Sequence, residues 1–354
     1  MNHQSVVVPV AQERPTAPAG EARAWAAGCP AGLSHAPWWL PGGHAQTIWP
    51  ALFARRPHVD YRRERWDTPD GDFVDVDWLA APAHADAPLV ALFHGLEGSS
   101  RSHYALALMD AVRALGWRGV VIHFRGCSGE PNRLPRAYHS GDSTEIAWIV
   151  QRLGALAAEL HVAGVSLGGN ALMRWLGETG RDATNRLASA AAISAPLDLM
   201  AAGDALGHGF NLVYTRQFLR TLRTKSLAKL ARHPALYDAA AVARSRTLRE
   251  FDDLVTAPLH GYRDTDDYWT RASSKPVLRH VAVPTLVLNA RNDPFMPASA
   301  LPTPQEVSPH VTLELPDEGG HVGFLNGPFP GRLDWLPQRL LHHFRHQTCS
   351  GRTG

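Results

Sequence analysis

The sequence predicts an α/β fold with a mainly parallel central sheet flanked by helices and a helical cap insertion. From about residue 72 to the end, short apolar runs alternate with amphipathic helical segments, as in βαβ units. Between about residues 199 and 280 this alternation stops and helical patterns take over. The chain has 354 residues, 45% of them hydrophobic, which is enough for a sizeable core. We expect one domain over residues 34–354, preceded by a flexible tail over residues 1–33 that is rich in Pro, Ala and Glu.

The first predicted elements follow one another closely. Residues 72–80, DFVDVDWLA, alternate apolar and polar side chains and predict a half-buried strand. Residues 87–95, APLVALFHG, form a continuous apolar run, which indicates a strand covered on both faces, and residues 118–126 repeat this pattern. Between them, residues 103–116 have helical spacing and end at a glycine. These segments predict the first strand–helix–strand unit of the sheet.

The middle of the chain predicts another such unit. Residues 141–154 are helical in pattern, and either Asp142 or Ser143 is suited to cap the helix. Residues 159–166 form an apolar strand that leads directly, through a glycine-rich turn, into a helix over residues 168–180. A strand that passes directly into a helix places the residue at the turn on the carboxyl edge of the sheet, where ligands bind in open α/β sheets.

The last strands are separated by the proposed cap. Strands are predicted over residues 187–196, 284–293 and 310–318, and a final helix around residues 332–346. The cap, about residues 199–280, lies between the first two of these strands, and a helical insertion at this point predicts a cap over the carboxyl edge of the sheet, where ligands bind. It contains a basic amphipathic stretch over residues 216–232, which predicts either a weak peripheral membrane contact or, as we favour, a solvated helix face.

Composition excludes several classes of protein. The net charge is +2, so no nucleic-acid partner is expected. Three widely separated cysteines, Cys29, Cys127 and Cys349, predict neither a disulfide framework nor a metal site. No apolar run is long enough to span a membrane, and the start lacks the pattern of a signal peptide. These features favour a cytoplasmic location, and they do not determine the oligomeric state.

A candidate nucleophile lies where the strand 159–166 meets the following helix. Gly164-Val165-Ser166-Leu167-Gly168 is a G-x-S-x-G motif, and the strand–helix junction gives this short pattern its meaning. The glycines allow a turn tight enough to hold the Ser166 hydroxyl away from the sheet. The N–H of Leu167, at the helix N-terminus, can then stabilise an oxyanion. The alternative is an ordinary glycine-rich turn with an incidental serine.

The loop FHGLEGSSRSHY, which follows the strand 87–95, is suited to supply a second oxyanion donor. The candidate is the N–H of Leu96, because Gly95 allows the chain to turn inward there. We interpret His94 as a structural residue whose ring fixes the loop. A phosphate-binding loop is the alternative, but the Gly-Lys-Ser/Thr that such a loop requires is absent.

A serine nucleophile needs a base and an orienting carboxylate, which follow the serine in the order acid, then histidine. Asp293 comes just after the apolar run TLVLNA of the strand predicted over residues 284–293, and His321 follows the strand 310–318 in EGGHVGF. Asp198 and Asp317 are the competing acids. The triplet Gly-Gly-His occurs in EGGHVGF and also in PGGHAQTIWP. His44 of the second segment precedes the serine in the chain and therefore has the wrong order for the base.

Other chemistry is less well supported. No H-E-x-x-H motif is present, and we interpret His342 and His346 of the last helix as solvated, so neither a metal nor a cofactor is expected. Cys127 is a possible rival nucleophile in RGCSGEPN, but no base accompanies it in any motif. Arg125 of the same stretch could bind a carboxylate or brace the loop, and bracing is favoured.

With these residues in place, the chain from about residue 70 onward resembles the α/β-hydrolase superfamily. The segments PGGHAQTIWP, HGLEGSS, FRGCSGEPNRLPRAYHSGDSTE and GVSLGGN resemble the AB hydrolase 4 family more specifically. This resemblance implies a Ser166, Asp293 and His321 triad and hydrolysis of short- to medium-chain acyl esters or acylglycerols. The same residues would serve an alcohol O-acyltransferase. A non-catalytic protein of this fold is a third possibility, although such proteins usually lack one triad residue.

Overall fold

The computed structural model describes the backbone of residues 36–80 and 83–350, with side chains to residue 346. The predicted tail over residues 1–33, together with Cys29, lies outside the described residues. Cys127 is a free thiol. Within the described part, no helix is long and apolar enough to cross a membrane. The cytoplasmic location remains a prediction.

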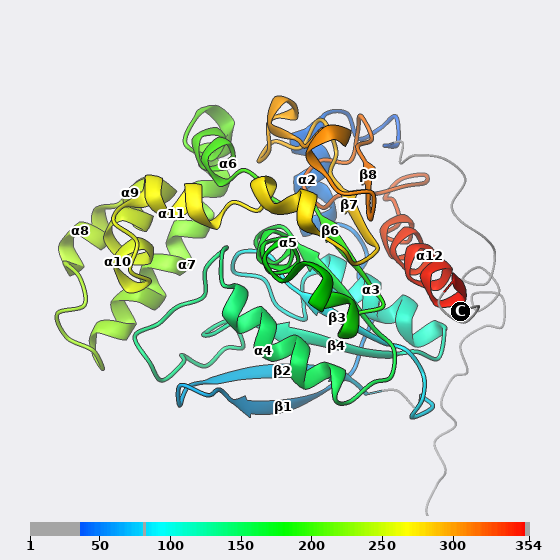
Figure 1. Cartoon of the computed structure of the whole chain (residues 1–354). Helices are drawn as coiled ribbons and strands as arrows, with labels where there is room; N and C mark the ends of the chain where they lie inside the picture. Colours follow the sequence, from blue (N-terminus) through cyan, green and yellow to red (C-terminus); the bar gives the residue numbers. More distant parts are fainter. Residues whose placement is uncertain (1–35, 81–82, 351–354) are drawn as a thin grey trace, which may run out of the picture.

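The centre of the protein is an eight-stranded sheet with the strand order β1-β2-β4-β3-β5-β6-β7-β8 (Figure 1). The pairs β1–β2 and β2–β4 are antiparallel, and every later pair is parallel. All seven predicted strands are present, which confirms the predicted fold class. The strands are β1 (Tyr61–Asp67), β2 (Phe73–Leu79), β3 (Leu89–Phe93), β4 (Arg118–His123), β5 (Leu160–Val165), β6 (Ser189–Ile193), β7 (Thr285–Leu288) and β8 (Val311–Glu314).

The edge strand β1 was not predicted because its sequence, YRRERWD, has no apolar run. Apart from the buried Trp66, the strand is held to β2 by cross-strand ion pairs. Arg63 Nε lies 2.7 Å from Asp77 Oδ1, and Arg65 Nε lies 2.8 Å from Asp75 Oδ1. Charges on an outer strand also discourage pairing with other chains.

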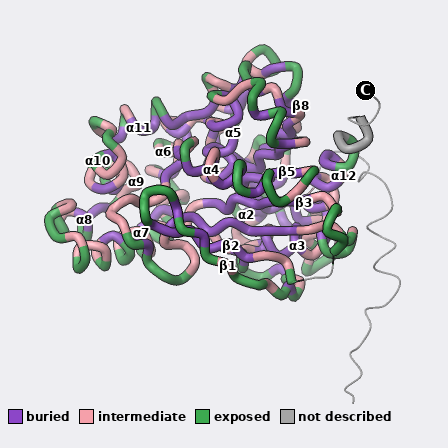
Figure 2. Tube along the Cα trace, turned by 60° about the horizontal axis from the view of Figure 1, so that its bottom comes forward, coloured by how far each residue is buried: buried purple, intermediate pink, exposed green. Residues whose placement is uncertain are grey.

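Helices cover both faces of the sheet. Successive residues of β3 alternate between the two faces: Leu92 packs in the layer under α3 (His103–Ala114) and α12 (Trp335–Ser350), and Phe93 packs under α4 (Ser143–Gly154) and α5 (Leu167–Thr179). Figure 2 shows central strands such as β3 and β5 as buried, whereas the edge strand β1 is largely exposed. The chain is therefore a three-layer α/β structure, with the four predicted helices in place.

The segment between β6 and β7 is helical, and most of its helices lie together beyond one side of the sheet (Figure 1). Its α7 includes the basic stretch that was expected to be solvated, but Lys225 pairs with Glu97 and Lys229 donates to the carbonyl oxygens of Pro135 and Arg136. Lys225 is exposed, as expected of a solvated face, whereas Lys229 is partly buried and departs from that expectation. The helices are α6 (Leu199–Leu206), α7 (Leu212–Leu230), α8 (Ala239–Arg244), α9 (Leu248–Phe251), α10 (Ala257–Leu259) and α11 (Thr265–Ala272), with a π-helical turn over Asp252–Thr256.

The remaining elements connect this framework. Helix α2 (Gly43–Leu52) precedes the sheet and was not predicted; it begins at a glycine and contains Pro50, both poor helix signals. The other short elements are 3₁₀ turns at Gly180–Asn185, Gly209–Asn211, Lys275–His280, Ala298–Ala300 and Pro304–Glu306.

Candidate active site

Ser166 occupies a strained turn between β5 and α5. Its backbone has φ 52° and ψ −121°, a conformation that non-glycine residues rarely adopt and that costs about 1–3 kcal/mol. The strand ends at Val165 and the helix begins at Leu167, so one residue makes the whole change of direction. The serine side chain is thereby held at the carboxyl edge of the sheet, as the G-x-S-x-G motif predicted.

The motif's second glycine is required by a close backbone approach. A Cβ added to Gly168 would lie 2.5 Å from the carbonyl oxygen of His94 and 2.7 Å from that of Phe93. Gly168 therefore lets the first turn of α5 pack directly on the end of β3. This contact sets the position of Ser166 relative to the loop that follows β3.

His321 lies between Ser166 and Asp293. Its Nε2 is 3.0 Å from Ser166 Oγ, and its Nδ1 is 2.9 Å from Asp293 Oδ2. The ionised carboxylate can only accept, so Nδ1 carries the hydrogen, which leaves Nε2 free to accept the serine proton. The Asp293 side chain is fully buried, and the Phe295 ring stacks on the imidazole at a centroid distance of 4.0 Å. The structure thus brings together the three residues predicted from separate loops.

The competing acids and histidines have other partners. Asp198 caps α6 by accepting from Ala201 N at 3.1 Å. Asp317 is exposed and lies 3.5 Å from Arg291 Nε. His44 is exposed, and its Nδ1 lies 3.1 Å from the hydroxyl of Tyr214 on α7. None of these contacts includes Ser166.

The loop after β3 passes beside the serine. A Cβ on Gly95 would lie 3.1 Å from Ser166 Cβ, and Leu96 and Leu167 line the same cavity as Ser166. Tyrosine hydroxyls accept the N–H groups of Gly95 and Glu97 at 3.0 Å and 2.9 Å, whereas no described residue accepts the N–H of Leu96. Of these three consecutive N–H groups, that of Leu96 therefore remains available as an oxyanion donor.

His94 is structural, as its position suggested. Its Nε2 accepts from Phe124 N at 3.2 Å and its Nδ1 donates to Gly95 O at 2.7 Å, so the ring links β4 to the loop. Complete burial lowers the pKa of His94 to about 3, so the ring stays neutral at physiological pH. The ring therefore holds the backbone next to Leu96 without adding a charge to the site.

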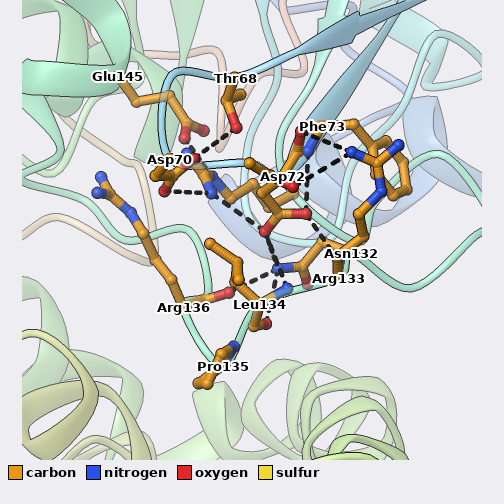
Figure 3. A network of polar contacts seen from close by, with 12 residues as sticks. Thr68, Asp70, Asp72, Phe73, Asn132, Arg133, Leu134, Pro135, Arg136 and Glu145 are labelled. Carbon is orange, nitrogen blue, oxygen red and sulfur yellow. Dashed lines mark hydrogen bonds and ion pairs between the residues drawn. The ribbon is translucent and has the colours of Figure 1, made fainter.

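The stretch that contains Arg125 and Cys127 braces the neighbouring loops. Arg125 is buried and pairs with Glu145 and, at 2.9 Å and 3.1 Å, with Asp70 and Asp72. Figure 3 labels these three carboxylates, which lie near one another. Burial raises the pKa of the Cys127 thiol to about 12, so the thiolate is not populated at neutral pH. Cys127 is therefore unsuited to be a nucleophile, and the bracing interpretation of Arg125 is confirmed.

A cavity of about 440 Å³ opens beside Ser166 and His321. The helices between β6 and β7 supply much of its wall, and most of that wall is apolar. A volume of this size is typical of sites for small organic ligands. The apolar residues from the cap that line it include Leu199, Leu206, Phe218, Leu222, Phe251 and Val255.

The two Gly-Gly-His triplets of the sequence lie against each other. A Cβ on Gly320 would approach the carbonyl oxygen of Gly43 to 2.8 Å, and a Cβ on Gly43 would meet the carbonyl oxygen of Asn292 at 1.9 Å. The first triplet therefore packs backbone to backbone on the loops that carry Asp293 and His321. This contact was not predicted from the sequence, although the glycines repeated in the two triplets indicated a close backbone approach.

The fold, the strained serine turn and the Ser–His–Asp arrangement together define an α/β hydrolase. The chain belongs to the α/β-hydrolase fold family, whose sequence model matches residues 88–328. The finer resemblance to the AB hydrolase 4 group remains a prediction. In a solved esterase from Exiguobacterium antarcticum the fold recurs with a TM-score of 0.52 at 15% identity, over 79% of this chain and 98% of that one.

Individual relatives are also similar over most of the chain. It is 42% identical to the "Putative esterase YheT" of Escherichia coli, over 84% of this chain and 88% of that protein. Identity to phospholipase ABHD3 of Homo sapiens is 33%, over 86% of this chain and 76% of that protein. The monoacylglycerol lipase of Saccharomyces cerevisiae is 28% identical, over 74% of this chain and 59% of that protein.

Proposed function

We propose that the protein is a serine hydrolase that cleaves carboxylic esters through a covalent acyl-enzyme. The observation that carries this proposal is the placement of His321, 3.0 Å from Ser166 Oγ on one side and 2.9 Å from Asp293 Oδ2 on the other. An imidazole that accepts from a serine and donates to a buried carboxylate is the arrangement that activates a hydroxyl for acyl transfer.

In the first half of the reaction His321 Nε2 takes the proton of Ser166 as Oγ attacks the carbonyl carbon. The resulting oxyanion is stabilised by the N–H groups of Leu96 and Leu167. His321 then gives the proton to the leaving alkoxide, and the alcohol departs. In the second half water attacks the acyl-enzyme with His321 again as base, and the carboxylic acid leaves Ser166 free. Asp293 stays ionised and stabilises the imidazolium in both halves.

The cavity supports a proposal for the substrate class. Its apolar wall favours an acyl chain, and a volume of about 440 Å³ suits short- to medium-chain esters or acylglycerols. The names of the relatives, an esterase, a phospholipase and a monoacylglycerol lipase, support ester substrates of lipid type. Transfer of the acyl group to an alcohol uses the same residues, and no feature of the site favours it over hydrolysis.

A chain-length series of p-nitrophenyl esters and monoacylglycerols tests the proposal with the purified protein. We expect hydrolysis that depends on acyl length and that is lost by at least about 10³-fold in the Ser166→Ala variant. A Ser166→Ala variant that retains near-full activity would show that another group is the nucleophile. Analysis of the products with added ethanol separates hydrolysis from acyl transfer.

A further inference from the structure

Helix α2 lies on the two loops that carry the acid and the base, although it precedes the sheet in sequence. The carbonyl oxygen of Gln46 lies so close to Gly323 that an added Cβ would approach it to 2.0 Å, and Gly43 is similarly close to Asn292. Because these contacts join backbone to backbone, a change of side-chain rotamer cannot absorb a shift between α2 and the loops. The position of α2 and the positions of the two loops are therefore linked.

Gln46 joins the two loops through one carboxamide oxygen. Its Oε1 accepts from Asn292 Nδ2 at 2.8 Å and from Gly319 N at 2.9 Å, and its Nε2 donates to Leu40 O at 3.0 Å. Asn292 precedes Asp293 in the chain, and its Oδ1 accepts from Gly320 N at 2.9 Å. Gln46 is 2% exposed, so water is not a ready replacement for these hydrogen bonds.

Thr47 contacts the base residue itself. Its Oγ1 accepts from the backbone N–H of His321 at 2.9 Å and donates to Gly43 O at 2.7 Å. The donated hydrogen bond fixes the direction of the hydroxyl, so a lone pair faces His321. The next residue of the loop is held as well, because Val322 N donates to Ser194 Oγ at 3.0 Å.

We propose that Gln46 and Thr47 are positioning residues that hold the Asp293 and His321 loops in register, so that the imidazole reaches Ser166 and Asp293 together. This inference rests on the proposed function. The imidazole makes two hydrogen bonds of 3.0 Å and 2.9 Å with groups from different loops. A displacement of either loop by about 1 Å would lengthen one of them beyond useful range. The segment GGHAQT thus acts on the site through the backbone of the loops that carry Asp293 and His321, without contacting the substrate.

The test uses paired variants of the full-length protein. Thr47→Val keeps the side-chain shape but removes the acceptor, whereas Thr47→Ser keeps the hydroxyl and removes only a methyl group. Gln46→Leu removes the bridge between the loops. Leu52→Ala is the matched control, because Leu52 is on the same helix and 67% exposed. Each variant is assayed for kcat and KM on the best ester, and for the rate at which a fluorophosphonate modifies Ser166. Circular dichroism and thermal unfolding show that each variant is folded at the assay temperature.

We expect Thr47→Val and Gln46→Leu to lower kcat and the labelling rate by about 10- to 100-fold while KM changes by less than about threefold. Thr47→Ser and Leu52→Ala should stay close to the wild-type protein. A folded Thr47→Val variant with wild-type kcat and labelling rate would overturn the inference, as would Thr47→Ser being impaired as strongly as Thr47→Val.

Failure of the proposed function gives a different pattern. In that case neither the wild-type protein nor any variant hydrolyses the esters in a way that depends on Ser166, and Ser166→Ala behaves like wild type. If the wild-type protein is active and Ser166→Ala is not, but both Gln46→Leu and Thr47→Val are unaffected, only the positioning inference fails.

Discussion

Gly168→Ala tests whether the contact between the serine turn and the end of β3 sets the reactivity of Ser166. The added Cβ would lie 2.5 Å from the carbonyl oxygen of His94, whereas ordinary contacts begin near 3.4 Å, so a gap of about 0.9 Å must open. Because that carbonyl precedes the loop with the Leu96 N–H, the displacement separates the nucleophile from its oxyanion donor. A misplacement of about 1 Å costs about 100-fold in rate, and overpacking costs about 1–3 kcal/mol of stability.

The assay is kcat/KM on a p-nitrophenyl ester, with urea denaturation to measure stability. Gly154→Ala is the matched control, because Gly154 ends helix α4 and the nearest atom to its added Cβ, Arg186 O, is 3.9 Å away. We expect Gly154→Ala to be active and as stable as the wild type or slightly more stable. Wild-type kcat/KM in a folded Gly168→Ala variant would refute the argument that this backbone contact positions Ser166.

The remaining predictions concern the carboxylates and the buried histidines. Asp293→Asn should lower kcat about 10⁴-fold in steady-state assays, because an amide favours the wrong imidazole tautomer; a loss below tenfold would contradict the assigned role. Asp72→Ala removes the acceptor that the buried Arg125 and Asn132 share, while Arg125 keeps its pairs with Asp70 and Glu145, and should cost about 1–3 kcal/mol in urea denaturation, more than Asp72→Asn; equal stability of the two variants would contradict this. Burial lowers the pKa of His94 to about 3 and of His103 to about 4, whereas both protonate below about 6.5 when unfolded. Folding stability should therefore fall as the pH drops from 6.5, by about 2 kcal/mol per histidine at pH 5, and a urea midpoint unchanged between pH 7 and pH 5 would contradict this.

The parallel core of the fold was predictable because its strands are apolar runs that end in glycines. A strand such as β3 is covered on both faces, so burial alone specifies its sequence. The antiparallel edge strand β1 was missed, since Trp66 is its one fully buried residue and its arginines Arg63 and Arg65 form ion pairs with the next strand, so no apolar run marks it. The α7 lysines show a second limit, because their partners Glu97 and Asn132 come from loops more than 90 residues away.

Ser166, Asp293 and His321 were found from sequence because each follows a recognisable strand, and parallel strands end at the same edge of the sheet. The contribution of α2 could not be found in this way. Gln46 and Thr47 act through hydrogen bonds to loops more than 240 residues later, and no local periodicity records such contacts. Only the two Gly-Gly-His triplets hinted at a close backbone contact, and their meaning depends on the folded structure.

The proposed mechanism requires Ser166 to be the nucleophile that becomes acylated. Mass spectrometry of the protein after reaction with a fluorophosphonate, followed by peptide mapping, tests it most directly. We expect stoichiometric modification of Ser166, loss of ester hydrolysis in proportion to labelling, and no labelling in Ser166→Ala. Modification of Cys127 or another residue in step with loss of activity, or full activity in a protein whose Ser166 is fully labelled, would contradict it.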